Sequence, residues 1–474
     1  MSSNISEKKG TGFNTKIGFV LATAGSAVGL GNIWRFPYLT AKYGGGIFIL
    51  VYIILAVTFG FTLMLTEIAI GRRTGKSVIG AYSTINKKFS FLGWLAAIVP
   101  FIITPYYCVI GGWVTKYFVS FTSGQMETIT QNSGDYFSNF IGNLPESTIY
   151  FSIFFILTGL AVMLGVKKGI ENLSKILMPL LLVLIVIIAF YTMTLNGAMD
   201  GLRYYLVPDF TRYDISKLPV TIVAAVGQLF YSMSIAMGIL VTYGSYMRKE
   251  DPIEKSVRQI EVVDTAVALL AGLIIVPSVF VFSNGDPNAL NQGPSLMFVT
   301  LPNVFNSMPA GGVIGAVFFF LVILAALTSS ISLLETMVSI VSEKFKVKRV
   351  PSTLICVGVI IVLGMLSVLG FNVLSQPTTN FLESIRSAVD LKKSFGISSV
   401  LDIFDFISNN ILMPLVAFAT CILIGYIAKT TYVEEEILVS QKEFKVKKMY
   451  RFMIKILCPI FMIAILVTPF IVKL

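Results

Sequence analysis

A glycine-rich stretch inside an apolar run is the feature that most constrains this chain. Residues 25–38 read Gly-Ser-Ala-Val-Gly-Leu-Gly-Asn-Ile-Trp-Arg-Phe-Pro-Tyr, within an apolar run that starts near Ile17. Three glycines in seven residues, followed by Asn32 and Arg35, disfavour a continuous helix at membrane depth. Unwound backbone in lipid costs on the order of several kcal/mol for each unpaired N–H or C=O group. The stretch therefore predicts a broken helix whose free backbone groups bind an ion or a ligand.

The composition indicates a protein that crosses the membrane several times. Of the 474 residues, 55% are hydrophobic and 13% are charged, which excludes an ordinary soluble domain. The net charge of +11 does not indicate a nucleic-acid partner, because Lys and Arg concentrate in alternate loops. The chain has no His, no nucleophile elbow and no phosphate loop. We therefore expect a protein that is not an enzyme.

Apolar runs of about 20 residues or more predict eleven membrane-spanning helices. They cover 17–39, 46–70, 91–121, 148–166, 173–195, 219–246, 260–284, 311–341, 351–374, 400–428 and 449–472. The basic loops follow the even-numbered helices, so the segment 1–16 is expected in the cytoplasm and the C-terminus outside. The expected location is a bacterial cytoplasmic (inner) membrane.

Helix 6 repeats the anomaly of helix 1. Residues 228–238 read Gln-Leu-Phe-Tyr-Ser-Met-Ser-Ile-Ala-Met-Gly, which places polar residues and a glycine at mid-depth. Each interruption lies in the first helix of a five-helix set, 17–195 or 219–428, and one further helix follows at 449–472. Matched breaks of this kind are typical of transporters built from an inverted repeat, with a binding site at the midplane. The predicted fold is all-α, with discontinuous helices 1 and 6.

Helix 8 carries a run of small hydroxylated residues. Thr328 and Ser329 lie on the same helix face as the carbonyl of Ala325. Hard oxygen ligands of this kind suit a group I cation. Alternatively, such residues let helices pack closely or bond to their own backbone.

Charged residues inside the membrane are functional hypotheses by default. Arg35 ends the helix 1 break, so an outer gate that pairs it with Asp405 is expected. Glu67, near the inner end of helix 2, is expected to be structural. Asp264 lies in helix 7 on the way to the predicted site, and a bare carboxylate there needs a cation or a proton nearby.

Long motifs of this chain resemble the neurotransmitter:sodium symporter family. They are residues 25–37, Gly44-Gly45-Gly46, Glu67 with Gly71-Arg72, residues 228–238 and Leu327-Thr328-Ser329-Ser330. The similarity is dense over helices 1–3, 6–8 and 10, and it indicates the bacterial amino-acid branch with the LeuT fold in an eleven-helix form.

The resemblance implies two Na⁺ sites. The first would use the carbonyl of Ala27 and the side chains of Asn32, Ser232 and Asp264. The carboxylate of the substrate would complete it. The second would use three carbonyls and two hydroxyls: Gly25, Val28, Ala325, Thr328 and Ser329.

The resemblance also implies an amino-acid substrate. Its carboxylate would meet the N–H groups of Leu30 and Gly31 and the hydroxyl of Tyr107. Monoamine-transporting members carry an Asp at the position of Gly29, where this chain leaves room for a substrate carboxylate. The other implied contacts are Ala27, Ile103, Tyr231, Ser232, Ser234, Met237, Ser329 and Leu333. None of these residues is charged, so a neutral, hydrophobic or aromatic amino acid is expected.

Two departures from the family pattern affect the expected mechanism. The chloride-linked positions correspond to Tyr52, Gln228, Ser232, Asp264 and Ala268. Asp264 stands where several relatives carry Asn, so we expect its carboxylate to replace chloride and to make transport chloride-independent. The inner gate of many members is altered to Gly10 and Phe13 with Lys8 and Lys9 nearby, so a lysine is expected to pair with Glu343, close to Tyr246.

The expected function is Na⁺-coupled import of an amino acid by alternating access, in a protein that is a monomer or a weak homodimer. The alternatives are a sensor or receptor with the same fold, or a transporter of another zwitterion or osmolyte.

Overall fold

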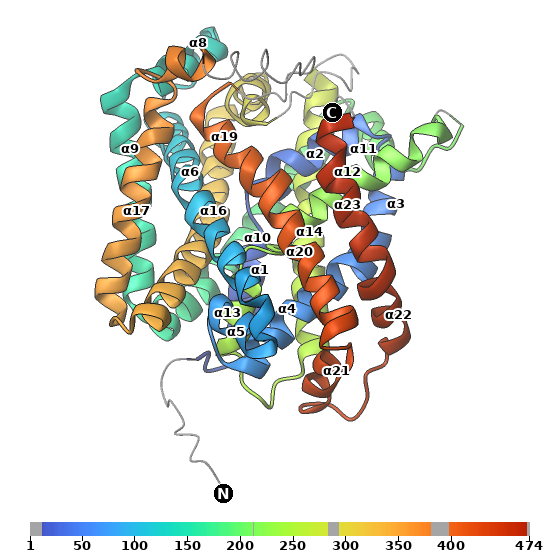
Figure 1. Ribbon diagram of the computed structural model, residues 1–474. Coiled ribbons are helices and arrows are strands. Elements are labelled where there is room, and N and C mark those ends of the chain that lie inside the picture. The colour runs from blue at the N-terminus through green and yellow to red at the C-terminus, as the bar shows by residue number, and fades with distance from the viewer. Residues whose placement is uncertain (1–11, 212, 283–292, 381–397, 472–474) are drawn as a thin grey trace, which may run out of the picture.

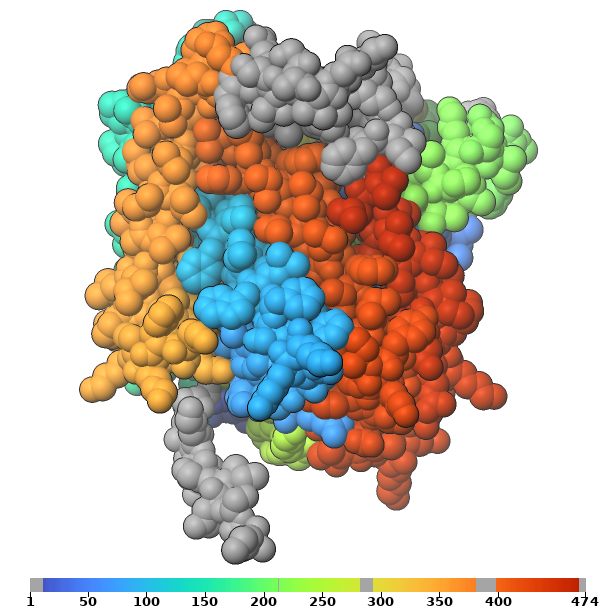
Figure 2. All heavy atoms as spheres, viewed as in Figure 1, coloured from blue at the N-terminus to red at the C-terminus, as the bar shows by residue number. Residues whose placement is uncertain are grey.

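The structure is a computed structural model that describes residues 12–211, 213–282, 293–380 and 398–471. Within these ranges the regular elements are all helical (Figure 1). Helices α5 (Val78–Ile85), α13 (Ile239–Tyr246) and α21 (Thr431–Leu438) lie at one end of the molecule, and α8 (Ser133–Gly142) lies at the other. In Figure 2, the side chains of α6, α17, α20 and α23 form a closed surface on one face.

Ten helical spans in the described residues are long and apolar enough to cross a membrane, and a bent pair, Lys16–Ala27 with Gly31–Lys42, makes an eleventh. The ten are Gly46–Thr74, Lys87–Thr122, Leu144–Met163, Val166–Met193, Ile215–Ser232, Ile253–Val281, Gly311–Phe345, Arg349–Leu369, Val400–Ile427 and Lys447–Thr468. The predicted number of spans is confirmed, although residues 283, 284 and 472 of the predicted spans lie outside the described ranges.

Several helices begin or end well away from the predicted positions. The seventh span starts at Ile253 instead of 260, because its first turns carry Glu254, Lys255 and Arg258. These residues are polar, so hydropathy alone does not include them in the helix. The helix simply continues beyond the apolar layer.

The break in helix 1 separates α1 (Lys16–Ala27) from a π-helical turn, η1 (Gly31–Arg35), which runs into α2 (Phe36–Lys42). The two halves meet at an angle of 55°. Val28 has extended backbone (φ −70°, ψ 108°), and the side chain of Asn32 accepts the N–H of Gly29 at 3.0 Å. Part of the freed backbone is thus satisfied from within the break.

The break in helix 6 lies between α12 (Leu218–Ser232) and α13, and its backbone is left-handed at three positions. Ser234, Ala236 and Gly238 have φ of 54°, 62° and 75°. Left-handed backbone costs a residue with a Cβ roughly 1–2 kcal/mol, so two of the three need compensation. The Glu67 carboxylate accepts the N–H of Ala236 at 2.8 Å, and the hydroxyl of Ser234 donates to the carbonyl of Ser26 at 3.0 Å. Glu67 therefore supports the helix 6 break, and Ser234 ties the two breaks together.

Close packing of α4 (Phe61–Thr74) on α13 positions the inner half of helix 6. A Cβ added to Gly71 would lie 1.9 Å from the carbonyl oxygen of Val241. Glycine at position 71 is therefore what allows the two helices to approach. At the same end, the guanidinium of Arg72 pairs with the Glu436 carboxylate of α21 at 2.8 Å, with both side chains almost fully buried.

We predict that Gly71→Ala lowers the free energy of unfolding by about 1–3 kcal/mol or more, because the contact is with backbone that cannot rotate away. Gly358→Ala is the matched control, since a Cβ at this exposed glycine of α17 (Arg349–Leu369) meets nothing within 4 Å. Thermal unfolding in detergent measures both. Equal stability of the two variants would contradict this packing.

Candidate ion and substrate site

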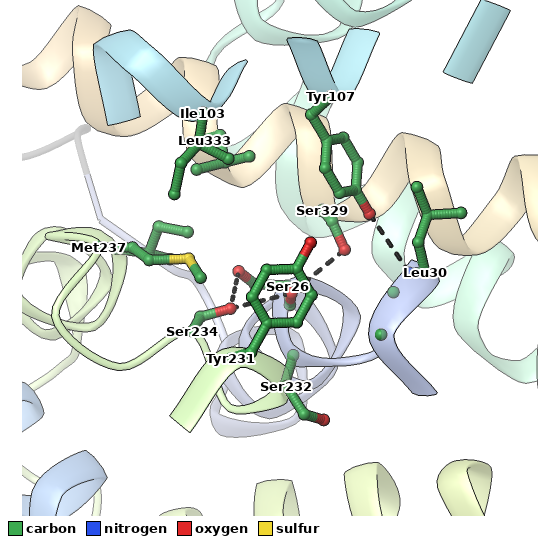
Figure 3. A pocket seen from close by; sticks show the side chains of 14 residues that line it. Ser26, Leu30, Ile103, Tyr107, Tyr231, Ser232, Ser234, Met237, Ser329 and Leu333 are labelled. Carbon is green, nitrogen blue, oxygen red and sulfur yellow. Dashed lines mark hydrogen bonds between the residues drawn. The ribbon is translucent and has the colours of Figure 1, made fainter. Parts of the chain in front are cut away.

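A cavity lies between the two helix breaks and is closed by α6 (Ser90–Thr122) and α16 (Gly311–Phe345). All eleven residues that the sequence assigns to substrate binding line it, together with three that were not assigned to the substrate, Ser26, Gly29 and Ile239. Figure 3 shows Tyr107 and Leu30 on one side of the cavity and Ile103, Met237 and Leu333 on the other. The sequence could have indicated Ser26 and Ile239 as lining residues, because each lies directly beside a helix break.

The side of the cavity near the helix 1 break is polar. The N–H of Leu30 points at the hydroxyl of Tyr107, 3.5 Å away. A Cβ on Gly29 would lie 2.9 Å from Oγ of Ser329 and 3.0 Å from the hydroxyl of Tyr107. Glycine at position 29 therefore lets both hydroxyls approach the helix 1 backbone, where they lie close to the N–H of Leu30. The opposite side is apolar, and none of the fourteen lining residues is charged.

Asp264 is a fully buried carboxylate at the edge of the helix 1 break, on α14 (Ile253–Phe282). It accepts the side-chain N–H of Asn32 at 2.8 Å and the hydroxyl of Ser232 at 2.9 Å. Within the part of the chain that the structure describes, no Lys or Arg forms an ion pair with it. An ionised carboxylate in this environment needs a cation. The groups that surround it are the amide of Asn32 and the hydroxyl of Ser232.

The helix 8 hydroxyls lie against the carbonyls released by helix 1. Oγ of Ser329 is 3.4 Å from the carbonyl oxygen of Gly25, 3.2 Å from that of Ser26 and 3.1 Å from that of Val28. One hydroxyl has one proton, so at most one of the three oxygens receives it. The remaining oxygens form a cluster suited to a hard monovalent cation. Thr328 instead bonds to its own helix, at 3.1 Å from the carbonyl oxygens of Leu324 and Ala325.

Two of the positions that the resemblance links to a chloride site hold polar atoms in the core. The hydroxyl of Tyr52 and Oε1 of Gln228 are buried and have no hydrogen-bond partner among the described residues, and Nε2 of Gln228 donates to the carbonyl of Gly31 at 3.0 Å. Ala268 is fully buried and contributes no polar atom.

The outer gate predicted from Arg35 and Asp405 is not formed as a direct ion pair. The Asp405 carboxylate instead accepts the hydroxyl of Tyr106 at 3.1 Å and the amide of Asn409 at 2.6 Å. The guanidinium of Arg35 faces the ring of Tyr231, with Cζ 5.5 Å from its centroid. A second cavity, lined by Arg35, Tyr231 and Asn409 among others, lies between these groups.

The acid that Tyr246 contacts is Glu335 and not Glu343, whereas the predicted pairing of Glu343 with a lysine stays a prediction. The hydroxyl of Tyr246 donates to Glu335 at 2.8 Å, and the guanidinium of Arg349 binds the same carboxylate. Glu343 lies about 12 Å further along the helix and accepts the N–H of Ser77 at 2.5 Å. Glu335 is the one charged residue in the predicted span 311–341, which is the signal that could have identified it.

Three aromatic rings, those of Phe13, Tyr243 and Tyr246, pack together at the inner end below the cavity, and we call this cluster the aromatic plug. The ring of Phe13 packs edge-on against Tyr243 and Tyr246, with centroids 5.5 Å and 6.4 Å apart, and its N–H donates to the carbonyl of Tyr246 at 3.1 Å. The predicted lysine partners, Lys8 and Lys9, and Gly10 lie outside the described residues.

A helical membrane protein with a small cavity, polar on one side and apolar on the other, between two broken helices, and with buried oxygen clusters beside it, is a secondary transporter. A family model described as the sodium:neurotransmitter symporter family matches residues 11–134 and 137–474. The chain belongs to this family, whose members are sodium-dependent transporters and not enzymes.

Three similar proteins agree with this assignment. An uncharacterized sodium-dependent transporter of Bacillus subtilis, YhdH, is 36% identical over 413 residues, covering 86% of each chain. A second, from Haemophilus influenzae, is 32% identical over 470 residues, covering 96% of this chain and 97% of its own. The crystal structure of MhsT in complex with L-phenylalanine, which has the LeuT fold, is 34% identical with a TM-score of 0.82, covering 97% of this chain and 99% of MhsT. The predicted fold class is confirmed.

We predict that Na⁺ stabilises the protein against heat relative to K⁺, and that Ser329→Ala removes at least half of this gain, because the hydroxyl joins the helix 1 carbonyls to helix 8. A ligand at a hundred times its Kd contributes about 2.7 kcal/mol. Ser330→Ala is the matched control, since that hydroxyl bonds to Leu327 and Thr158 away from the site. An Na⁺ effect of the same size in both variants would contradict the assignment.

Proposed function

We propose that this chain imports a neutral, hydrophobic or aromatic amino acid together with Na⁺, without chloride, by alternating access. One observation carries the proposal. Asp264 is a fully buried carboxylate, bonded only by Asn32 and Ser232 among the described residues, at the edge of a cavity between two broken helices. When ionised, such a carboxylate needs a cation beside it, and the adjoining cavity offers polar and apolar sides to a ligand.

Na⁺ is a substrate in this scheme, bound at two places. The first is formed around Asp264 by Asn32, Ser232 and the carbonyl of Ala27, which also lines the cavity. The second is the oxygen cluster at Ser329, completed by the carbonyl of Ala325 and the hydroxyl of Thr328 once that hydroxyl turns away from its own helix. Ion and amino acid are coupled because both use the helix 1 break.

The amino acid is oriented by the polarity of the cavity. Its carboxylate is placed at the N–H groups of Leu30 and Gly31 and the hydroxyl of Tyr107, where a helical segment begins and favours an anion. Its side chain lies toward Ile103, Met237 and Leu333. The lining has no charge to neutralise an acidic or basic side chain, and MhsT, a structural neighbour, holds L-phenylalanine.

The two ends of the cavity supply the gates of an alternating-access cycle. Arg35, which lines the second cavity, would pair with Asp405, which is bonded to Asn409 of the same lining, when the outer side closes over bound substrate. At the inner end, the contacts of Phe13 with helix 6 and of Tyr246 with Glu335 would separate for release. The distribution of basic residues among the loops supports an inner end that faces the cytoplasm of a bacterial cell. Each chain holds a complete site, so the cycle needs no second copy.

Uptake into proteoliposomes tests the proposal. The purified chain is reconstituted, and a panel of labelled amino acids is supplied with an inward Na⁺ gradient or with K⁺ in its place. We expect Na⁺-dependent accumulation of one or a few neutral, hydrophobic or aromatic amino acids. Binding without accumulation would indicate a sensor, and a response only to amines or osmolytes would refute the amino-acid assignment.

We also predict that replacing chloride by gluconate leaves uptake unchanged, because the carboxylate of Asp264 supplies the negative charge. Asp264→Asn should reduce uptake at least about a hundredfold, since it removes a charge-assisted ion contact. Adding Ala268→Ser should restore part of the activity only when chloride is present.

The control is Glu261→Gln, which neutralises an acid one turn earlier on the same helix without touching Asn32 or Ser232. Loss of wild-type uptake in gluconate, or the same loss in both single variants, would contradict the role of Asp264.

A further inference from the structure

The Glu171 carboxylate joins the start of helix 5 to the start of helix 1. Glu171 ends a π-helical turn, η4 (Val166–Glu171), directly before α10 (Asn172–Met193), and it is fully buried. Oε2 accepts the backbone N–H of Asn14 at 2.7 Å, and Oε1 accepts the hydroxyl of Thr15 at 2.9 Å. These donors are more than 150 residues away in the sequence.

Helix 1 is shaped to receive this carboxylate. Thr15 is the N-cap of α1, and its hydroxyl accepts the N–H of Gly18 at 3.0 Å while it donates to Glu171. A Cβ on Gly18 would lie 2.3 Å from Oε1 of Glu171, so only glycine permits this approach. A carboxylate at a helix N-terminus is also favoured by the helix dipole.

A lysine completes the cluster but does not link the two helices. Nζ of Lys175 lies 2.6 Å from Oε1 of Glu171, one turn along the same segment. Its side chain is one-third exposed, and partly exposed pairs of this spacing contribute little to stability. The bonds to Asn14 and Thr15 are the ones that cross between helices 5 and 1.

The segment held by Glu171 connects the inner end to the ion site. Phe13, one residue before Asn14, forms the aromatic plug against α13. Further along α1, Gly25 contributes a carbonyl to the oxygen cluster at Ser329 and packs against Met178 of α10. Movement of the start of α1 away from helix 5 would therefore disturb both the plug and the cluster.

We propose that Glu171 is a positioning residue that latches the start of helix 1 to the start of helix 5. The latch keeps the inner end closed and holds the Gly25 carbonyl in the ion site, and it must release when the inner end opens. The latch itself follows from the contacts, whereas its effect on transport rests on the proposed function.

Hydrogen–deuterium exchange of the purified full chain in Na⁺ tests the latch. Glu171→Gln removes the charge and leaves one acceptor oxygen, so the amide can accept from either the N–H of Asn14 or the hydroxyl of Thr15 but no longer receives both with separate oxygens. Peptides within 12–27 should then exchange about tenfold faster, as expected for losing hydrogen bonds to a charged group, while peptides from α16 remain unchanged. Lys175→Met is the matched control and should exchange as the wild type does, because both bonds to helix 1 remain.

A second readout and a milder variant separate the latch from a general loss of folding. Thr15→Val keeps the side-chain shape but loses the hydroxyl, so it should accelerate exchange in the same peptides to a smaller degree. If Glu171→Gln does not yield folded protein, this variant decides the question. In proteoliposomes, both variants should raise the Na⁺ concentration for half-maximal uptake, and Lys175→Met should not.

Unchanged exchange in a folded Glu171→Gln protein would overturn the latch, as would equal acceleration in Lys175→Met. Faster exchange in a chain whose wild type shows no Na⁺-dependent uptake would support the latch and refute the proposed function.

Discussion

The rest of this structure depends on how backbone groups are satisfied where two helices break inside the membrane. Hydrogen bonds from the chain itself use some of these groups: Asn32 binds the N–H of Gly29, Glu67 that of Ala236, and Gln228 the carbonyl of Gly31. The carbonyls of Gly25 and Val28 are different, because they share one hydroxyl, that of Ser329, which also lies near the Ser26 carbonyl that Ser234 already serves. In the proposed function a cation completes these oxygens, which would allow the breaks to persist at membrane depth.

The buried carboxylates, like the backbone groups at the breaks, differ in whether the chain itself supplies a partner. Asp264 and Glu67 are buried carboxylates without an ion pair among the described residues, and each bonds directly to a broken helix or its neighbour. At the inner end, by contrast, Glu335 and Glu171 have the cations Arg349 and Lys175 beside them. Acids with a fixed cation therefore stabilise closed contacts, while the proposed function assigns a mobile cation to Asp264.

The sequence predicts the helices, both breaks and the cavity well, because these depend on local signals. Glycines and polar residues inside apolar runs mark the breaks, and the motif around Asn32 aligns the site with a known family. Contacts set by tertiary geometry were not predictable in the same way. From the sequence, Glu343 was expected close to Tyr246. In the structure the hydroxyl of Tyr246 bonds to Glu335, which lies earlier on the same helix. It suggested a direct pair of Arg35 with Asp405, whereas Tyr106 and Asn409 hold that carboxylate. Glu171 gave no signal, because its partners are distant residues at the start of helix 1.

Direct binding of radioactive sodium to the purified protein tests whether ion and amino acid share the helix 1 break. We expect saturable Na⁺ binding that K⁺ does not displace. We also expect a transported amino acid to tighten this binding severalfold, because coupling between two ligands is reciprocal. Sodium binding that is absent, or that no amino acid alters, would contradict a shared break.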